Sequence, residues 1–373
     1  MLLAAAFALP VGLTAVSASA QKVETVADFY GAMPTGVTVS HTGRVFVNYP
    51  HWGDQVPFTV AEIKNGKAVA YPNAAVNKIN KKNPAACLYS VQSVVVDPKD
   101  RLWALDTGSV KLGPNVLNGP KMVCMDLKTN TITRKVFFPR SVVPASTYLN
   151  DVRFDLRRGK AGMAFITDSG AKSPGGIIVV DLASGHSYRR LGNHPSTQYV
   201  KDFTPIVEGL PLLTRKHGLS PQHLKLKSDG IAMGADGKTL YYCPLASRHL
   251  YSVSLDALAD PKRSESDVAA TVKDLGVKGA SDGLDSDAEG RVYATDYEHA
   301  RVLRGKPGGP YTTVLQMPTR FWPDTLSISQ DGYLYATGNE LQRMAMFHNG
   351  KDLRVKPYKL YRVKVDAKPV VIK

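Results

Sequence analysis

Four aspartates occupy the positions of this sequence at which side chains could do chemistry together. Asp151, Asp229, Asp282 and Asp324 each open a short apolar or alternating stretch, followed by a turn and a second strand-like stretch. Carboxylates that converge on one point repel one another, which favours a bound cation, a protonated amine or raised carboxyl pKa values. Whether they converge depends on the elements that position them.

The residues around these aspartates recur as a repeat. In three units an acidic residue followed by glycine comes seven residues after the first aspartate, namely Asp236-Gly237, Glu289-Gly290 and Asp331-Gly332. Such pairs between strand-like stretches are strong hairpin signals, because glycine adopts the positive φ of tight turns. Three earlier stretches fit the same frame, so the units begin at Thr35, Gln92, Asp151, Asp229, Asp282 and Asp324. Six such units predict an all-β fold, a six-bladed β-propeller.

The last unit lacks one strand. It runs out of chain after its third predicted strand, which begins at Lys359, and we expect residues 23–29 to supply the outer strand and close the ring. Residues 21–373 are therefore predicted to form one domain, because dividing the ring would expose unpaired strand edges. Residues 193–227 interrupt the repeat and are expected to form a long loop or short helices over one face.

Residues 1–20 have the features of a secretory signal peptide. They carry no charge and end in Ala18-Ser19-Ala20, the small-x-small pattern of a cleavage site, although no basic residue opens the segment. A membrane anchor is the alternative, but the apolar run is shorter than the ~20 residues that span a bilayer. We therefore expect a secreted or periplasmic protein, in which Cys87 and Cys124 form a disulfide or the thiols, with Cys243, stay buried and unpaired.

The net charge of the chain indicates which macromolecular surfaces it could bind. The net charge of +15 predicts attraction to anionic surfaces such as a cell envelope or an acidic polymer. Nucleic acid is not an expected partner, because the basic residues are scattered and no nucleic-acid-binding module is present. The sequence gives no indication of the oligomeric state.

Strand directions predict where the polar residues lie. In a four-stranded antiparallel blade, the loops that enter the inner strand share a face with the loops after the second strand. The six unit starts should then surround one mouth of the central channel. Residues that end second strands should lie farther out on the same face, and these are Tyr49, Asp106, Asp168, Asp296 and Asn339. Alternatively, each aspartate caps its own turn by accepting backbone N–H groups.

Several motifs resemble those of the royal jelly/yellow protein family. They are Arg101-Leu-Trp-Ala-Leu-Asp-Thr-Gly108, Tyr148-Leu-Asn-Asp151, Ala164-Phe-Ile-Thr-Asp-Ser-Gly170, Trp322-Pro-Asp-Thr-Leu326 and Gly338-Asn339. The resemblance implies a secreted six-bladed propeller; members include jelly proteins, salivary binders of biogenic amines and insect proteins linked to dopachrome conversion. In the amine binders, the positions that match Thr325 and Asn339 lie in the pocket. Leu341 departs from the aromatic residue that those binders carry.

The primary functional hypothesis is a small cationic or aromatic ligand held at the polar mouth. The residues expected to bind it are Gln92, Tyr148, Asn150, Asp151, Asp229, Asp282, Asp324, Thr325 and Asn339. One alternative is a metal-dependent lactonase of the gluconolactonase type, with a divalent cation such as calcium on Asp151, Asp229, Asp282 and Asp324. Another is a dopachrome-type tautomerase with one of these aspartates as general base. No nucleophile-elbow motif is present, so Ser-His-Asp catalysis is not expected. The sequence does not decide whether the protein is catalytic, and a purely structural role stays open.

Overall fold

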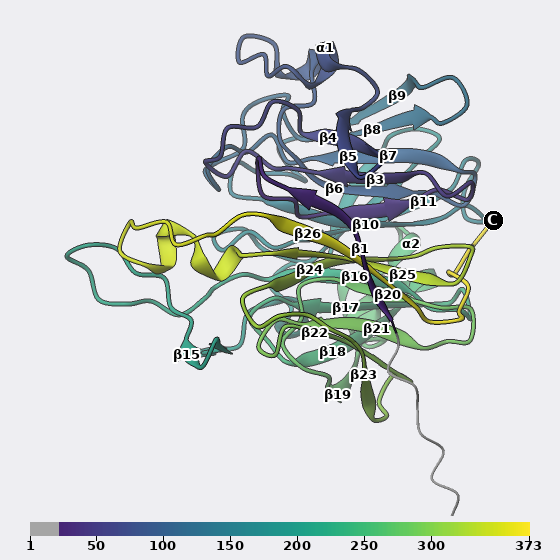
Figure 1. Cartoon of the computed structure of the whole chain (residues 1–373). Helices are drawn as coiled ribbons and strands as arrows, with labels where there is room; N and C mark the ends of the chain where they lie inside the picture. The colour runs from purple at the N-terminus through teal and green to yellow at the C-terminus, as the bar shows by residue number, and fades with distance from the viewer. Residues whose placement is uncertain (1–21) are drawn as a thin grey trace, which may run out of the picture.

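Six antiparallel four-stranded sheets surround a central axis in the computed structural model, which describes residues 22–373 (Figure 1). The predicted six-bladed β-propeller is thereby confirmed. The expected signal peptide, residues 1–20, lies outside the described residues.

Each blade places one strand against the inner strands of neighbouring blades. These inner strands are β2 (Val37–Val39), β6 (Val91–Val96), β10 (Leu149–Asp155), β16 (Ser228–Met233), β20 (Leu284–Ser286) and β24 (Trp322–Ile328). The second strands are β3 (Val45–Asn48), β7 (Arg101–Asp106), β11 (Met163–Asp168), β17 (Thr239–Pro244), β21 (Val292–Asp296) and β25 (Tyr333–Asn339). The third strands are β4 (Val60–Lys64), β8 (Lys121–Asp126), β12 (Ile177–Asp181), β18 (His249–Ser254), β22 (Arg301–Gly305) and β26 (Tyr358–Lys364). The outer strands are β5 (Lys67–Ala70), β9 (Thr131–Phe137), β13 (Ser187–Arg190), β19 (Lys273–Val277), β23 (Tyr311–Gln316) and β1 (Val23–Phe29).

The ring closes as the strand count predicts. β1 is the fourth strand of the last blade and pairs antiparallel with β26, from Val23 opposite Val363 to Phe29 opposite Tyr358. The first described strand thus completes the sheet formed by the end of the chain, and no blade is left with three strands.

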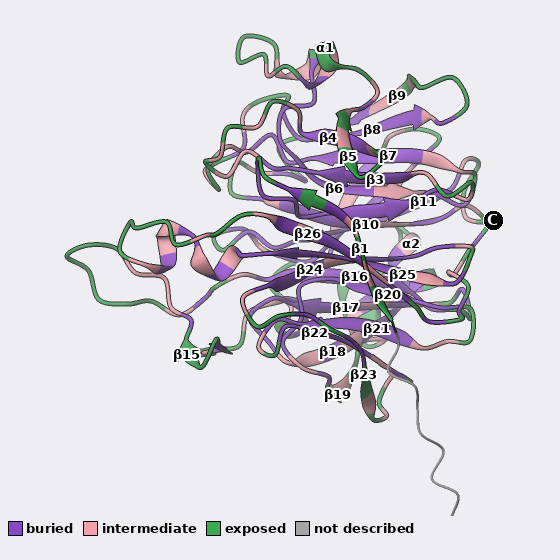
Figure 2. Cartoon of the chain, viewed as in Figure 1, coloured by how far each residue is buried: buried purple, intermediate pink, exposed green. Residues whose placement is uncertain are grey.

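Burial follows the position of each strand in its blade (Figure 2). All six residues of β11 are buried, whereas only Val136 is buried in the outer strand β9, whose other residues are exposed or partly buried. Apolar side chains fill the space between neighbouring sheets, as where the rings of Trp103 and Phe154 lie 5.3 Å apart between the second and third blades. Burial of this apolar surface holds adjacent blades together.

The longest insertion lies on one face of the ring. Residues 193–227 contain the 3₁₀ helix η2 (Pro195–Thr197) and a hairpin of β14 (Ile206–Val207) and β15 (Leu210–Pro211). The insertion projects from the same face as η3 (Leu341–Arg343) and η4 (Ala345–Phe347), and the C-terminus lies at the opposite face (Figure 1). The remaining helices are the single-turn η1 (Pro84–Ala86), α1 (Ala74–Asn77), α2 (Leu255–Ala259) and α3 (Glu265–Ala269).

The suggested disulfide between Cys87 and Cys124 is wrong. Cys87, Cys124 and Cys243 are all buried free thiols. Cys124 packs in the core between the second and third blades, whereas Cys87 lies after η1 and accepts a hydrogen bond from the Asn80 backbone at 3.3 Å. Across residues 22–373, no helix combines the length and apolar character needed to cross a bilayer.

Candidate functional site

The inner strands are irregular where the predicted site residues lie. Pairing with the second strand slips between Val91 and Ser93, Leu149 and Val152, Ser228 and Ile231, and Pro323 and Leu326. A β-bulge adds an unpaired residue and redirects side chains, and bulges are common beside functional sites. The skipped residues include six of the predicted site residues, namely Gln92, Asn150, Asp151, Asp229, Asp324 and Thr325.

Buried threonines on the second strands stabilise three of these strand starts. The hydroxyl oxygens of Thr167, Thr295 and Thr337 accept the backbone N–H groups of Asp151 (3.2 Å), Asp282 (2.9 Å) and Thr325 (3.0 Å). Thr167 also donates to the Asp229 carbonyl oxygen of the next blade at 2.6 Å. Sequence analysis did not identify these threonines, although Thr directly precedes Asp168 and Asp296 and so offered a signal.

Two glycines allow neighbouring blades to approach closely at the aspartates. A Cβ atom on Gly230 would lie 2.5 Å from the Asp282 carbonyl oxygen, and one on Gly283 would lie 2.3 Å from that of Asp324. Any larger residue would push these blades apart. Glycine after Asp229 and Asp282 therefore brings three aspartates of successive blades together.

Asp229, Asp282 and Asp324 form a buried group, here called the carboxyl cluster. Asn150 Nδ2 donates to Asp229 at 2.5 Å, Trp322 Nε1 donates to Asp282 at 2.7 Å, and Asn339 Nδ2 donates to Asp324 at 2.8 Å. The three aspartates are 4%, 7% and 2% exposed. They accept no backbone N–H group among the hydrogen bonds of the described residues, so turn capping does not explain them.

The environment of the carboxyl cluster favours the protonated forms of its three aspartates. Burial, followed by the charge of Asp282 and a hydrogen bond between the two carboxyls, raises the pKa of Asp229 well above its usual value. Burial raises the pKa of Asp282 to about 6, although the hydrogen bonds from Trp322 and Asp229 oppose the shift. Burial and the charge of Asp282 also raise the pKa of Asp324. Two carboxyls that share a hydrogen bond need one proton between them, so Asp229 and Asp282 act as a proton-sharing pair.

Asp151 differs from the carboxyl cluster because it has a cationic partner. Arg153 Nη1 donates to Asp151 Oδ2 at 2.9 Å, and Ser93 Oγ donates to Oδ1 at 2.6 Å. This ion pair partly neutralises Asp151 and places a guanidinium in the channel. Like the three buried threonines, Arg153 is not among the site residues predicted from the sequence.

Tyr148 and Gln92 form a hydrogen-bonded chain beside the carboxyl cluster. Trp52 Nε1 donates to the Tyr148 hydroxyl at 2.7 Å, which donates to Gln92 Oε1 at 2.9 Å. Burial raises the pKa of Tyr148, and the charges of Asp229, Asp324 and Asp282 raise it further. The tyrosine hydroxyl is therefore a neutral donor within the field of the carboxyls.

The aspartates that end second strands are structural. Asp106 accepts the backbone N–H of Ser90 at 2.9 Å and the Lys121 ammonium at 2.7 Å. Asp168 accepts the Tyr148 N–H at 3.0 Å and pairs with Arg189 at 2.7 Å. These contacts fix the loops that enter the inner strands. The turn-capping alternative therefore describes these aspartates.

Residues of the 193–227 insertion pack over the channel mouth at which the carboxyl cluster lies. Phe203 and Leu224 of the insertion pack in one apolar group with Tyr297 and Trp322. The rings of Tyr297 and Trp322 stack at 4.0 Å, and this Trp322 is the donor to Asp282. The insertion therefore covers the side of the mouth that Tyr297 and Trp322 form.

The donor set does not fit the divalent cation considered from sequence. Within residues 22–373, no group of three or more His, Cys, Asp or Glu residues is arranged to hold a metal ion. Asp151 is paired with Arg153, and burial raises the pKa of Asp229, which favours its protonated form. Calcium needs six to eight oxygen ligands, and protonated or arginine-paired carboxyls are poor ligands for it.

Solved structures share the fold of this chain. The luciferin-regenerating enzyme matches with a TM-score of 0.59 at 14% identity, over 95% of this chain and 99% of that one. Regucalcin of Agrobacterium tumefaciens, described as a calcium-binding protein, matches with a TM-score of 0.54 at 14% identity, over 95% and 98%. A gluconolactonase of Xanthomonas campestris matches with a TM-score of 0.54 at 12% identity, over 94% and 93%. At these identities the likeness concerns the fold alone.

Sequence comparison is more specific. Protein yellow of Drosophila melanogaster is 28% identical over 248 residues, covering 63% of this chain and 43% of that protein. Protein yellow of Drosophila pseudoobscura pseudoobscura is 29% identical over 248 residues, covering 63% and 42%. The match thus spans about two fifths of the length of these relatives. The family profile described as Major royal jelly protein matches residues 89–368. The chain therefore belongs to the major royal jelly protein family.

Proposed function

We propose that this protein binds a small organic cation at the carboxyl cluster. The observation that carries the proposal is a set of three buried carboxyls, from three successive blades, none of which pairs with a Lys, Arg or His side chain within residues 22–373. Buried charges are costly unless they are paired. A ligand ammonium group would supply the missing partner and allow the carboxyls to ionise.

The surroundings suit a cation with an aromatic body. Trp322 donates to Asp282 and stacks on Tyr297. Trp52 donates to Tyr148, whose hydroxyl lies in the field of the carboxyl cluster. Aromatic faces attract organic cations and stack on aromatic ligands. In this proposal Asn150, Thr325 and Asn339 orient the ligand through the carboxyls that they already contact.

The test is calorimetric titration with two compounds, tyramine and tyrosol. Tyrosol has a neutral hydroxyl group where tyramine has an ammonium group. We expect tyramine to bind at least about tenfold more tightly, because a charge-assisted hydrogen bond contributes about 1.5–3 kcal/mol. Asp282→Asn and Asp324→Asn should each remove most of this preference. Asp236→Asn, at an exposed hairpin turn, is the matched control and should bind tyramine as the wild type does. Equal affinity of the wild type for the two compounds would refute the proposal.

A second candidate function rests on the proton-sharing pair. An ionised Asp282 could take a proton from a carbon of an enolisable quinone while Asp229 returns one to another atom, so that the ligand is isomerised without net loss of protons. Loss of dopachrome colour would measure this reaction. The candidate requires that both Asp229→Asn and Asp282→Asn abolish catalysis, and turnover by either variant would eliminate it. Within residues 22–373, no metal-binding donor set supports the lactonase alternative.

The location and the larger partners are also proposals. Residues 1–20 support export to the periplasm or cell exterior, and the net charge of +15 supports association with anionic envelope or polymer surfaces. Determining the N-terminus of exported protein tests the first point, with Gln21 expected as the first residue. Retention of binding to an acidic polymer at high salt would contradict the second, because exposed charges are screened.

A further inference from the structure

The channel contains a cavity beyond the carboxyl cluster. It has a volume of about 100 Å³, and residues from all six inner strands line it, so it lies on the propeller axis. Thr325, which follows Asp324 of the carboxyl cluster in sequence, lines the cavity, and so do the C-terminal residues Pro369–Val371. Part of the cavity wall is apolar and is formed by Val94, Met233 and Leu326. None of the aspartates of the carboxyl cluster lines it.

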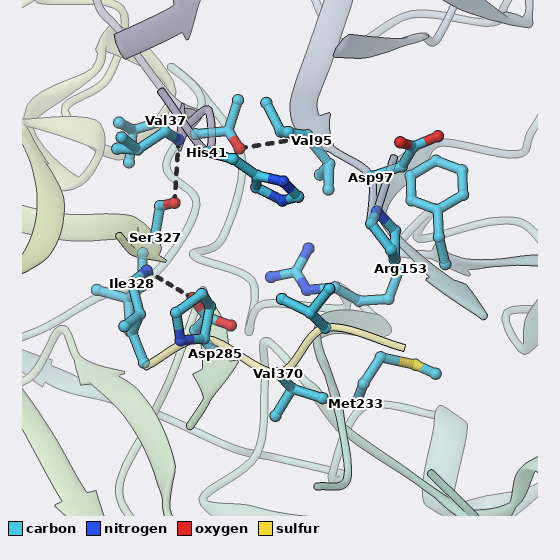
Figure 3. Close-up of a pocket in the computed structure, with 18 of the residues that line it drawn as sticks. Val37, His41, Val95, Asp97, Arg153, Met233, Asp285, Ser327, Ile328 and Val370 are labelled. Atoms are coloured by element: carbon cyan, nitrogen blue, oxygen red, sulfur yellow. Dashed lines mark hydrogen bonds between the residues drawn. The ribbon is translucent and has the colours of Figure 1, made fainter. Parts of the chain in front are cut away.

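Arg153 is the principal charge of this cavity. Its Nη1 donates to Asp151 and to the Val152 carbonyl oxygen (2.8 Å), and its Nη2 donates to the Leu284 carbonyl oxygen (2.7 Å). The N–H on Nε and the second N–H on Nη2 have no partner among the described residues. Figure 3 shows the guanidinium and the His41 ring pointing into the same space. A guanidinium with free N–H groups is suited to a carboxylate acceptor.

The two carboxylates that line the cavity accept hydrogen bonds from other groups. Burial raises the pKa of Asp285, and the nearby charge of Arg153 opposes that shift. The oxygens of Asp285 accept the backbone N–H groups of Ser286 (2.8 Å) and Ile328 (2.9 Å). Asp97 accepts hydrogen bonds from Arg101 (2.7 Å) and Trp103 (2.8 Å). Neither carboxylate hydrogen-bonds to Arg153. The free N–H groups of Arg153 therefore remain available to a ligand.

The C-terminal segment forms the floor. The Lys368 carbonyl oxygen accepts the Ala288 N–H at 2.9 Å, and the Ile372 carbonyl oxygen accepts the Leu156 N–H at 3.1 Å. The side chain of Ile372 packs in the core beside Met233. A segment held by so few bonds opens at a lower free-energy cost than a strand inside a sheet. Opening it would connect the cavity to solvent without unfolding a blade.

We propose that this cavity binds a small organic monocarboxylate, with its carboxylate on Arg153 and its short chain against the apolar wall, and that residues 369–373 gate access. The site is distinct from the carboxyl cluster and does not depend on the function proposed for it. The net charge of +15 draws anions toward the protein.

The test titrates the protein with butyrate, the neutral isostere butyramide and the cation butylamine. Butyrate should bind at least about tenfold more tightly than butyramide, because the ionised oxygen strengthens the bonds to Arg153. Butylamine should not compete with butyrate. Arg153→Gln should lose butyrate binding, whereas Arg301→Gln, which removes an arginine paired with Asp296 outside the cavity, should bind as the wild type does. Absence of butyrate binding, or equal binding of butyramide, overturns the proposal.

Two variants that leave Arg153 in place keep the test independent of folding defects. Val370→Trp fills the cavity from the tail and should abolish butyrate binding while thermal unfolding stays cooperative. A chain ending at Lys368 should bind butyrate with faster association and faster dissociation in stopped-flow measurements. If Val370→Trp bound butyrate with the affinity of the wild type, butyrate would bind elsewhere. If the shortened chain bound and released butyrate at wild-type rates, residues 369–373 would not gate access.

Discussion

At the scale of single residues, the distinction is between aspartates that hold the fold and aspartates that the fold leaves uncompensated. Asp106 and Asp168 accept backbone N–H groups and pair with cations, so their charges are neutralised locally. Asp229 and Asp282 face each other instead. Both kinds of aspartate occupy repeated positions in the sequence. The difference between them becomes visible only from their partners.

This difference predicts the pH dependence of stability. The pKa of Asp282 rises from 3.8 to about 6 on folding, so its carboxyl favours the folded state at low pH and that contribution is lost as the pH rises through about 6. Asp282→Asn mimics the protonated form and can still accept the Trp322 N–H. We expect it to raise the free energy of unfolding at pH 8 by on the order of 1 to 3 kcal/mol, and to change it little at pH 4.

Chemical denaturation at the two pH values measures this effect. Asp181→Asn is the control, because the Ser184 backbone N–H lowers the pKa of Asp181 and removing that carboxylate should not stabilise the protein at pH 8. An Asp282→Asn protein that is less stable than the wild type at pH 8 and equally stable at pH 4 would contradict the assignment of the shared proton.

At the scale of elements, the bulged strand starts position the site and the buried threonines maintain the bulges. Thr337 accepts the N–H of Thr325 and donates to the Thr35 carbonyl oxygen at 2.7 Å, which joins the last blade to the first. The strands themselves follow from the spacing of apolar stretches and acidic-Gly turns. The bulges could not be predicted in this way, because a slip of one residue leaves the apolar pattern nearly unchanged.

Thr337→Val should therefore destabilise the protein although valine suits a strand. The substitution leaves the Thr325 N–H and the Thr35 carbonyl oxygen without partners in a buried place, and we expect a loss of about 1–3 kcal/mol in the free energy of unfolding. Urea denaturation measures it. Thr313→Val, on the exposed side of β23, is the matched control and should be nearly neutral. A neutral Thr337→Val would mean that the hydroxyl is dispensable.

At the scale of the whole molecule, closure of the ring explains why chain segments far apart in sequence form one site. Counting strands predicted that β1 completes the last blade, because every other unit contained four. Residues 193–227 were expected to lie over one face because they interrupt the repeat. Their packing with Tyr297 and Trp322 could not be predicted, since the insertion has no repeat to compare with. Cysteine pairing depends on spatial distances, and the sequence left both outcomes open. The role of Arg153 required knowledge of which strand residues face the axis.

Removing the closing strand tests this view of the molecule. A chain that begins at Tyr30 lacks β1, including the buried side chains of Ala27 and Phe29, and exposes the edge of β26. We expect the free energy of unfolding to fall by more than about 3 kcal/mol, as for loss of a buried aromatic side chain, and the open edge to promote association. Light scattering and denaturation should be compared with a chain that begins at Gln21. Two chains of equal stability, both monomeric, would show that closure by β1 is not needed.

The central claim, that the carboxyl cluster receives a cation, is tested most directly by counting protons released on binding. Calorimetry of tyramine binding at pH 6, in buffers of different ionisation enthalpy, gives this number. A cation at Asp229 and Asp282 favours their ionised forms, so the wild type should release up to about one proton per ligand and Asp282→Asn markedly less. Tyramine binding without proton release, or with the same release in both proteins, would contradict the account.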